Sequence, residues 1–553
     1  IRPYVFISRR RPKKQKALEL RWRHQTSLPK SAGYESGAYL GSAWKEVQRV
    51  ELSVDRLFNG GLLIEKDPGE PRWTDHLVGF VETDRIPGGS RAIVGNFRIE
   101  SGQGLVLWGP YGLSKGADPV ATVTKHPRGA VGYTYADENS YLTGVAIESA
   151  FRGEEIMLFA SRTPIDATFN TDETVRSIPT SGLHRTQSEI EKKNILREEI
   201  AGGRLTTFTA WGTVGMTAWW SRYSHPIQKT DPTRYHFAFN GKQNSVVGAD
   251  WDITLARLNL TGEIARSQSG GSAFIGNAIV DINNLTFVLS CRHFDPDFHN
   301  PRSHSFGSAE VCNEEGVYLG FAGKLSPSTR VSLAYDLLRK PWRTYTTPVP
   351  TRGNDLLLQI EQKWSRTFSS ILRARLRQDE SLEKGSVPPG REVDILQNRF
   401  HHLLRFELRY HPTRWLQLRT RFEGITVLYP GIPGAIHCTT QKETGRLIYQ
   451  DIRVEPHAHI RFSARWIFFD TPSYDSRVYE FENDLPGVLT IRSVYGRGIR
   501  WYLLCRWQTL PLIRLTAKFG SFIRFGVSSI GSGNDRIRGN TEREFGLQMD
   551  IVL

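Results

Sequence analysis

The sequence has 553 residues, a formal net charge of +15, 39% hydrophobic residues and 23% charged residues. No apolar run approaches the roughly 18 residues that a membrane-spanning helix needs, so the sequence excludes a helical membrane protein. Glycine is abundant at 50, aromatic residues make up 11% and methionine numbers only 3, which favours many short strands over a packed helical core.

The chain starts with a basic lead, IRPYVFISRRRPKKQK, at residues 1–16. Its charges suit contact with phosphates or lipid head groups, although such a run is more often a solvated linker. From Ala17 onward apolar and charged residues alternate, as in ALELRWR. A period of two predicts an extended strand with one apolar face, so we place the start of a strand-rich domain, residues 17–553, here.

A glycine-dense segment follows at residues 91–119. Glycine permits backbone conformations that other residues resist, which suits a loop folded tightly inside a confined space. Neither the Walker spacing nor the dinucleotide-binding spacing of glycines is present, which disfavours a phosphate cradle. We predict an internal Gly-rich loop that acts as a plug or constriction, with the candidate residues Gly102, Gln103, Gly104, Trp108 and Gly109.

One short helix is predicted over residues 187–198, within a polar insertion. Thr186 and Glu189 form a capping-box pattern, which satisfies free backbone amides at a helix start. Gly202 and Gly203 follow its expected end. Because the helix is short and highly charged, we expect it to lie in a loop.

The loop of residues 291–312 contains histidines and aspartates that are metal ligands by type. Their spacing fits no fixed template, so we predict no metal and no cofactor. The four cysteines of the chain show no C-x-x-C spacing. Cys291 and Cys312 flank the loop, and in an oxidising envelope compartment they are candidates for a disulfide.

The strand pattern is clearest in residues 401–424, HHLLRFELRYHPTRWLQLRTRFEG. Apolar residues fall mainly on even positions and charged residues on odd ones, on both sides of a break at Pro412 and Thr413, which predicts a tight antiparallel hairpin. A soluble sandwich needs a second sheet over its apolar face. A barrel in a bilayer turns that face to lipid and its charged face to a lumen, and we favour this barrel over a multi-domain soluble β-protein.

Short and long connections alternate in the second half of the chain, with longer polar loops at residues 379–398, 429–445 and 470–498. Outer-membrane barrels have this asymmetry, whereas a propeller blade would need four strands where only two fit. The fold class that we predict is all-β: a transmembrane antiparallel up-and-down β-barrel of about 24 strands in the bacterial outer membrane. A final strand that pairs with the first would leave no open edge.

Arginines on the inward face of this barrel are the strongest functional feature. Such side chains attract anions into a narrow polar channel, or they pair with carboxylates across strands and make the wall rigid. For any single arginine we favour the cross-strand pair. The lumen-facing basic candidates are Arg373, Arg375, Arg377, Arg405, Arg409, Arg419 and Arg421.

An envelope hydrolase would need a serine, a histidine and an acid that converge in space. Ser181, His184 and Asp172 lie close in the sequence. No G-x-S-x-G nucleophile elbow is present in the chain, however, so we predict that the protein is not an enzyme.

Seven stretches together carry a family resemblance. They are EKDPGEP (65–71), VGNFRIESGQGLVLW (94–108), SGLHRTQSEIEKK (181–193), NEEGVYLG (313–320), YDSRVYEFEND (474–484), YGRGIRWYL (495–503) and GSGNDRIRG (531–539). The chain resembles large outer-membrane β-barrels of Gram-negative bacteria that carry an N-terminal helix-hairpin-helix region of the competence-protein type. IRPYV is similar to the tail of that region, which implies that the region itself lies upstream and contacts nucleic-acid phosphates there.

These patterns predict a non-enzymatic outer-membrane barrel that serves as a pore or as the membrane component of a larger envelope complex. The alternative is a protein for nucleic-acid uptake or anchoring, which only the resemblance and the basic lead suggest. The expected partners are outer-membrane lipid, other envelope proteins and, through the upstream region, nucleic acid.

Overall fold

The computed structural model describes residues 16–55, 57–86, 90–109, 115–231, 235–307, 310–387, 391–431 and 440–553. Nearly all of the basic lead, part of the glycine-dense segment and Cys438 therefore lie outside the described residues. Within the described residues no helix is long and apolar enough to cross a membrane.

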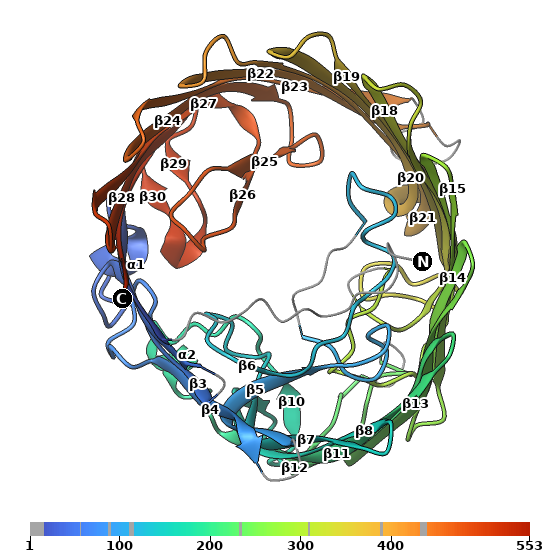
Figure 1. Ribbon diagram of the computed structural model, residues 1–553. Coiled ribbons are helices and arrows are strands. Elements are labelled where there is room, and N and C mark those ends of the chain that lie inside the picture. The colour runs from blue at the N-terminus through green and yellow to red at the C-terminus, as the bar shows by residue number, and fades with distance from the viewer. Residues whose placement is uncertain are drawn as a thin grey trace.

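Antiparallel strands close into one ring (Figure 1), which in the described part of the chain has 24 members. They are β1 (Lys16–Leu28), β2 (Trp44–Val54), β3 (Phe58–Lys66), β4 (His76–Ile86), β5 (Ser90–Glu100), β7 (Leu142–Phe151), β8 (Glu154–Ile165), β11 (Leu196–Thr209), β12 (Gly212–Ile227), β13 (Gly241–Leu255), β14 (Leu258–Ser267), β15 (Ser272–Ile282), β16 (Leu285–Phe294), β17 (Glu314–Lys324), β18 (Thr329–Lys340), β19 (Thr351–Lys363), β20 (Phe368–Val387), β21 (Arg391–Tyr410), β22 (Leu416–Tyr429), β23 (Gln441–His457), β24 (Ile460–Thr471), β27 (Gly496–Leu510), β28 (Ile513–Arg524) and β31 (Thr541–Val552). The predicted all-β barrel of about 24 strands is confirmed.

The other elements are short and lie in connections or inside the ring. They are α1 (Ala32–Glu35), β6 (Gly129–Gly132), β9 (Thr168–Phe169), β10 (Val175–Ser177), α2 (Gln187–Ile190), β25 (Val478–Glu482), β26 (Thr490–Val494), β29 (Ser529–Ile530), the 3-10 helix η1 (Gly533–Asp535) and β30 (Ile537–Arg538).

The ring closes where β31 pairs with β1 in antiparallel register, from Glu19 opposite Val552 to Leu28 opposite Arg543. Across this seam the Nε atom of Arg21 donates to a carboxylate oxygen of Asp550 at 2.6 Å. Closure gives the backbone groups of the first and last strands a partner, as a lipid environment requires.

Connections at one end of the barrel are short, such as residues 210–211, 256–257 and 283–284. Those at the other end are long, such as residues 166–195 and 295–313. The short turn after β15 contains Asn283 with a φ of +56°, a conformation that asparagine adopts more readily than most residues. The predicted alternation of short and long connections is thus present, but the loop predicted at residues 379–398 is wrong, because residues 379–387 belong to β20 and residues 391–398 to β21.

Side chains of the β21–β22 hairpin show how the wall is oriented. Leu404 and Phe406 are 58% and 39% exposed, whereas Glu407 and Glu423 are buried at 3% and 4%. Apolar residues therefore face outward and charged residues inward, which is the reverse of a soluble protein. A closed barrel with this outer surface and an even number of strands is an outer-membrane β-barrel.

The predicted loop helix exists but is shorter than expected. Thr186 and Glu189 form the capping box, with the Thr186 hydroxyl accepting from the Glu189 backbone N–H at 3.3 Å. The prediction that the helix continues to residue 198 is wrong: α2 ends at Ile190, and Leu196 already pairs with Ile165 across the β11–β8 ladder. The four-residue helix α1 was not predicted.

Replacing Phe406 with arginine tests the outward orientation. We expect the free energy of unfolding to fall by about 2–4 kcal/mol, because the charge would enter the hydrocarbon well inside the strand. Tyr410, the last residue of β21, is the control position, where arginine should cost about 0–1 kcal/mol. Urea unfolding in lipid vesicles, followed by tryptophan fluorescence, measures both costs. Equal costs at the two positions would contradict an outward face in lipid.

Candidate functional site

After β5 the chain turns into the barrel, where residues 101–109 form an inner loop (Figure 1). The loop docks on the carboxylate of Glu263, a wall residue of β14 that is 0% exposed. The backbone N–H groups of Gln103, Leu105 and Val106 donate to this carboxylate at 2.6, 2.8 and 3.1 Å. A buried carboxylate without donors is strongly disfavoured, so Glu263 and the inner loop depend on each other.

Two glycines make this close approach possible. Gly102 and Gly104 have φ values of +53° and +84°, which L side chains rarely adopt. A Cβ on Gly102 would lie 2.7 Å from the carboxyl carbon of Glu263, and one on Gly104 would lie 2.3 Å from the backbone oxygen of His304. Glycine is therefore required at both positions.

The other plug candidates lie in the same place. The Gln103 amide exchanges hydrogen bonds with the backbone of Lys125, at 3.0 Å to its N–H and 3.3 Å to its oxygen. The Lys125 ammonium lies 4.5 Å from the centre of the Trp108 ring. Gly109 packs against the side chain of Arg98. The structure thus brings together all five plug candidates; that they block passage stays a proposal.

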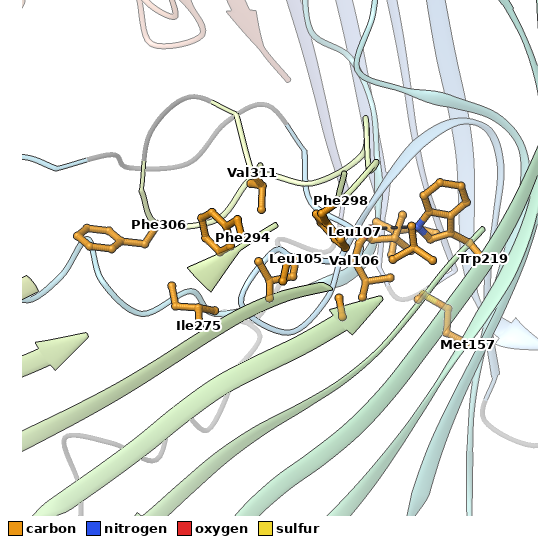
Figure 2. Close-up of a cluster of buried hydrophobic side chains, with 14 of the residues drawn as sticks. Leu105, Val106, Leu107, Met157, Trp219, Ile275, Phe294, Phe298, Phe306 and Val311 are labelled. Atoms are coloured by element: carbon orange, nitrogen blue, oxygen red, sulfur yellow. Dashed lines mark hydrogen bonds between the residues drawn. The ribbon is translucent and has the colours of Figure 1, made fainter. Parts of the chain in front are cut away.

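Apolar side chains of the inner loop pack on the wall (Figure 2). Leu105, Val106 and Leu107 are buried together with Phe294 and with Trp219, whose indole N–H donates to the backbone oxygen of Val106 at 3.1 Å. The inward face of the wall is therefore apolar in this sector, whereas the strand pattern predicted a charged face toward the lumen. The reason is physical: the inner loop brings apolar surface into the barrel, and the facing wall must cover it.

A second inner element is the hairpin of β25 and β26, which lies inside the ring (Figure 1). This hairpin was not predicted, because residues 470–498 were expected to form a long polar loop. The alternation in VYEFE, with Glu480 and Glu482 on one face and Tyr479 and Phe481 on the other, is the signal that could have identified it. Both glutamates are buried, while the two aromatic residues are exposed.

Ion pairs fix this hairpin to the wall. Glu480 accepts hydrogen bonds from Arg421 and Arg465, both at 2.6 Å. Glu482 accepts from Arg500 at 2.8 Å. Arg465 and Arg500 are themselves 0% exposed. Loss of one partner would leave a buried charge without compensation, a costly change, so the hairpin is a fixed part of the lumen.

Six of the seven arginines predicted to face the lumen contact carboxylates. The pairs are Arg375–Asp355, Arg377–Asp379, Arg405–Glu423, Arg409–Glu407, Arg419–Asp451 and Arg421–Glu407. Arg373 differs, because its guanidinium donates only to the amide oxygen of Gln359, at 2.8 and 2.6 Å, among the described residues. Its charge is thus not neutralised by a carboxylate.

A cavity of about 350 Å³ lies between the inner loop region and the β25–β26 hairpin. Seven Lys or Arg side chains and five Asp or Glu side chains line it, so it carries an excess of positive charge. Arg477 also lines this cavity and has no carboxylate partner within the described part of the chain; its guanidinium donates to the Tyr479 hydroxyl at 2.7 Å. The cavity therefore holds two guanidinium groups that can receive an anion.

A wider cavity of about 800 Å³ adjoins this one on the side of the long connections. Both cavities share Lys115, Arg375 and Arg377 in their lining. Trp342 and Tyr345 add exposed aromatic rings to the wider cavity. The two cavities thus share part of their wall.

A separate charged network ties the long connections together around the buried His184 side chain. Its Nδ1 atom lies 2.6 Å from a carboxylate oxygen of Asp75, and its Nε2 atom lies 2.8 Å from one of Asp166. Burial disfavours the charged imidazole, but these two hydrogen bonds outweigh it and raise the pKa of His184 to about 10. Burial raises the pKa of the nearby Glu138 to about 8.

This network also contains the one group of candidate metal ligands that the described residues bring together: Glu70, Asp75, Glu138 and His184, with ligand atoms within 4.8 Å of one another. Their contacts do not fit a metal. Both imidazole nitrogens are already hydrogen-bonded to carboxylates, and the Lys193 ammonium lies 2.6 Å from a carboxylate oxygen of Asp75. The arrangement is a charged hydrogen-bond network between loops, which sequence spacing gave no means to find.

Cys291 and Cys312, the candidates for a disulfide, are both free thiols in the structure. The two residues belong to different environments. Cys291 lies on β16, on the same outward face as Phe287 and Leu289, whereas the Cys312 sulfur lies 3.9 Å from the carboxylate of Glu310. The alternation of the strand therefore turns the Cys291 thiol toward lipid.

No protein-family model and no curated protein matches the sequence. Solved structures with a similar fold include the siderophore receptor PirA from Pseudomonas aeruginosa, at 9% identity and a TM-score of 0.47, covering 98% of this chain and 81% of that one. The copper transporter OprC has 8% identity and a TM-score of 0.47, covering 98% and 84%. The outer membrane transporter YddB from Escherichia coli has 8% identity and a TM-score of 0.43, covering 98% and 81%. These proteins are described as a receptor and transporters, not as enzymes.

Replacing Glu263 with alanine is expected to release the inner loop, because three backbone donors lose their acceptor. Hydrogen exchange of peptides covering residues 101–109, measured by mass spectrometry, should become at least roughly tenfold faster, as expected for the loss of about 1.4 kcal/mol or more. Glu315 on β17, which is partly exposed, serves as the alanine control and should leave these peptides protected. Unchanged protection in Glu263→Ala would show that the loop is held by other contacts.

The loop network should weaken in alkali. Both His184 and Glu138 have pKa values raised in the folded protein, so their contribution to stability is complete below their unfolded values. It is lost as the pH rises through about 8 for Glu138 and about 10 for His184. Cleavage of the long connections by proteinase K should therefore accelerate over this range in the wild type.

The variant His184→Asn provides the comparison for the pH experiment. It should be cleaved faster than the wild type at pH 7, and the difference should shrink towards pH 10.5 as the wild-type imidazole loses its proton. A difference that stays constant with pH would contradict a charged imidazole.

Proposed function

We propose that this protein is an occluded transport barrel of the outer membrane, which admits small anionic solutes from the long-connection side to the basic cavity in its lumen. The observation that carries this proposal is the pair of guanidinium groups, Arg373 and Arg477, that line the cavity without a carboxylate partner among the described residues. The proposed role is non-enzymatic.

The charge of the cavity supports an anionic solute. Carboxylate-paired arginines such as Arg375 and Arg405 hold the wall rigid, since each makes two hydrogen bonds to one carboxylate. The two arginines without such partners present planar donor sets that match carboxylate or phosphate oxygens. Walls of low dielectric strengthen this attraction, because they focus the field in the lumen.

Two inner elements support occlusion rather than a free pore. The inner loop is held by buried hydrogen bonds to Glu263, and the β25–β26 hairpin is held by buried ion pairs. A solute can shift the equilibrium between the closed and the open state only by the difference between its affinities for the two states. We therefore infer that opening depends on another envelope component, which makes the barrel the membrane part of a larger complex.

Planar-bilayer recordings test this proposal. The wild type should carry little current, and Glu263→Ala should open the barrel and favour chloride over potassium. Adding Arg373→Gln and Arg477→Gln to the opened barrel should reduce the chloride preference several-fold, because the uncompensated charges are removed. Arg162→Gln, at a side chain that is 62% exposed on β8 and lines neither cavity, is the charge-matched control. A large steady wild-type current, or a preference unaffected by the double substitution, would contradict the proposal.

Nucleic-acid uptake or anchoring is the second candidate, because a phosphodiester is also an anion that this cavity attracts. The nucleic-acid partner and the upstream helix-hairpin-helix region stay predictions from the resemblance. Block of the opened barrel by a short single-stranded oligonucleotide, relieved steeply by salt, would favour this candidate. Block by small carboxylates alone would favour the transport of small anions.

A further inference from the structure

A groove of about 670 Å³ lies on the outer wall of the barrel, where β21, β22, β23, β24 and β27 are neighbours (Figure 1). Its centre is Gly424, whose side-chain position is open: a Cβ there would meet no atom within 4 Å. The large side chains around it project farther from the sheet than the glycine does. The glycine thus leaves a depression in a surface that otherwise faces hydrocarbon.

The lower wall of this groove is a registered row of apolar side chains. Across five successive strands the opposed residues are Phe406, Phe422, Ile448, Phe468 and Ile499. All point outward, by the alternation that buries their neighbours. An unbroken apolar row of this kind meets acyl chains.

The next row, toward the long connections, changes character. Its opposed residues are Leu404, Gly424, Arg446, Asp470 and Arg497. Two arginines therefore stand directly above the apolar row, at the level where hydrocarbon gives way to head groups. The row carries two arginines and one aspartate, a net positive charge, and this step from apolar to positively charged within one residue pair matches an amphiphile with a negative head group.

Neither arginine is neutralised by a close carboxylate. Arg446 has no hydrogen bond or ion pair in the portion of the chain that the structure describes. Arg497 lies 3.9 Å from Asp470, and both side chains are largely exposed, at 73% and 67%. An exposed pair at that distance contributes little, so a phosphate can replace Asp470 as the partner of Arg497.

We propose that this groove is a binding site for a phosphorylated, acylated lipid of the outer leaflet, with an acyl chain over Gly424 and the phosphate between Arg446 and Arg497. Acyl chains fill the apolar depression, and the guanidinium groups donate charge-assisted hydrogen bonds to the phosphate oxygens. A zwitterionic lipid of the same chain length lacks the net charge that these arginines favour. This site is independent of the lumen and of the transport that we propose there.

Lipid retention measured by native mass spectrometry tests the proposal. The whole barrel is released from phosphatidylcholine vesicles that contain a minority of phosphatidic acid, and the bound lipids are counted. The wild type should keep phosphatidic acid in preference to phosphatidylcholine. Gly424→Trp, which fills the depression, and the double variant Arg446→Gln, Arg497→Gln should each reduce this retention by about tenfold.

Two controls make the result specific. Ala278→Trp adds the same bulk to an outward position of β15, and Arg352→Gln removes an exposed charge elsewhere; both should retain phosphatidic acid as the wild type does. Heat-modifiable migration in gels confirms that each variant folds. Excess inorganic phosphate should not release the lipid, because the acyl chain is also held. Three results would overturn the proposal. They are equal retention of the two lipids by the wild type, an equal loss of phosphatidic acid in Ala278→Trp and Gly424→Trp, and release of the lipid by phosphate alone.

Discussion

The structure depends on one requirement: in hydrocarbon every backbone N–H and C=O group must find a partner within the protein. Pairing of β31 with β1 meets it, because the sheet then has no edge along the ring. The same requirement fixes which way side chains point. Since each strand contacts lipid on one face only, Leu404 and Phe406 turn outward and Glu407 inward, and the charged residues of the wall are confined to the lumen.

A lumen of this size has to be filled, and the chain fills it in two physically different ways. The inner loop is apolar and is held by one buried carboxylate, Glu263, that binds three backbone amides. The β25–β26 hairpin is held by ion pairs to Arg465 and Arg500, both fully buried. Between these two elements the wall keeps uncompensated positive charge, and this is why the basic cavity lies there and not elsewhere in the lumen.

Sequence alone predicts the wall well, because alternation is a local signal: the period-two pattern of residues 401–424 appears directly in the hairpin of β21 and β22. It predicts the contents of the lumen poorly. Ala273, Ile275 and Ile279 face inward on β15 beside apolar outward neighbours, so the period disappears where both faces are apolar. The contact of Gln103 with Glu263 joins residues far apart in the sequence, and no spacing rule anticipates such a pair. The arginines could be predicted because they lie on the strands with the clearest alternation. Which of them lack a carboxylate partner could not be predicted from the sequence.

The seam between β1 and β31 has a consequence for biogenesis. Its ion pair joins Arg21 to Asp550, residues separated by 529 positions, so the contacts that close the ring form only after the intervening strands exist. Until then the growing sheet carries two unpaired borders that invite pairing with other chains. Those borders must therefore stay shielded from other chains until the two ends of the sheet meet.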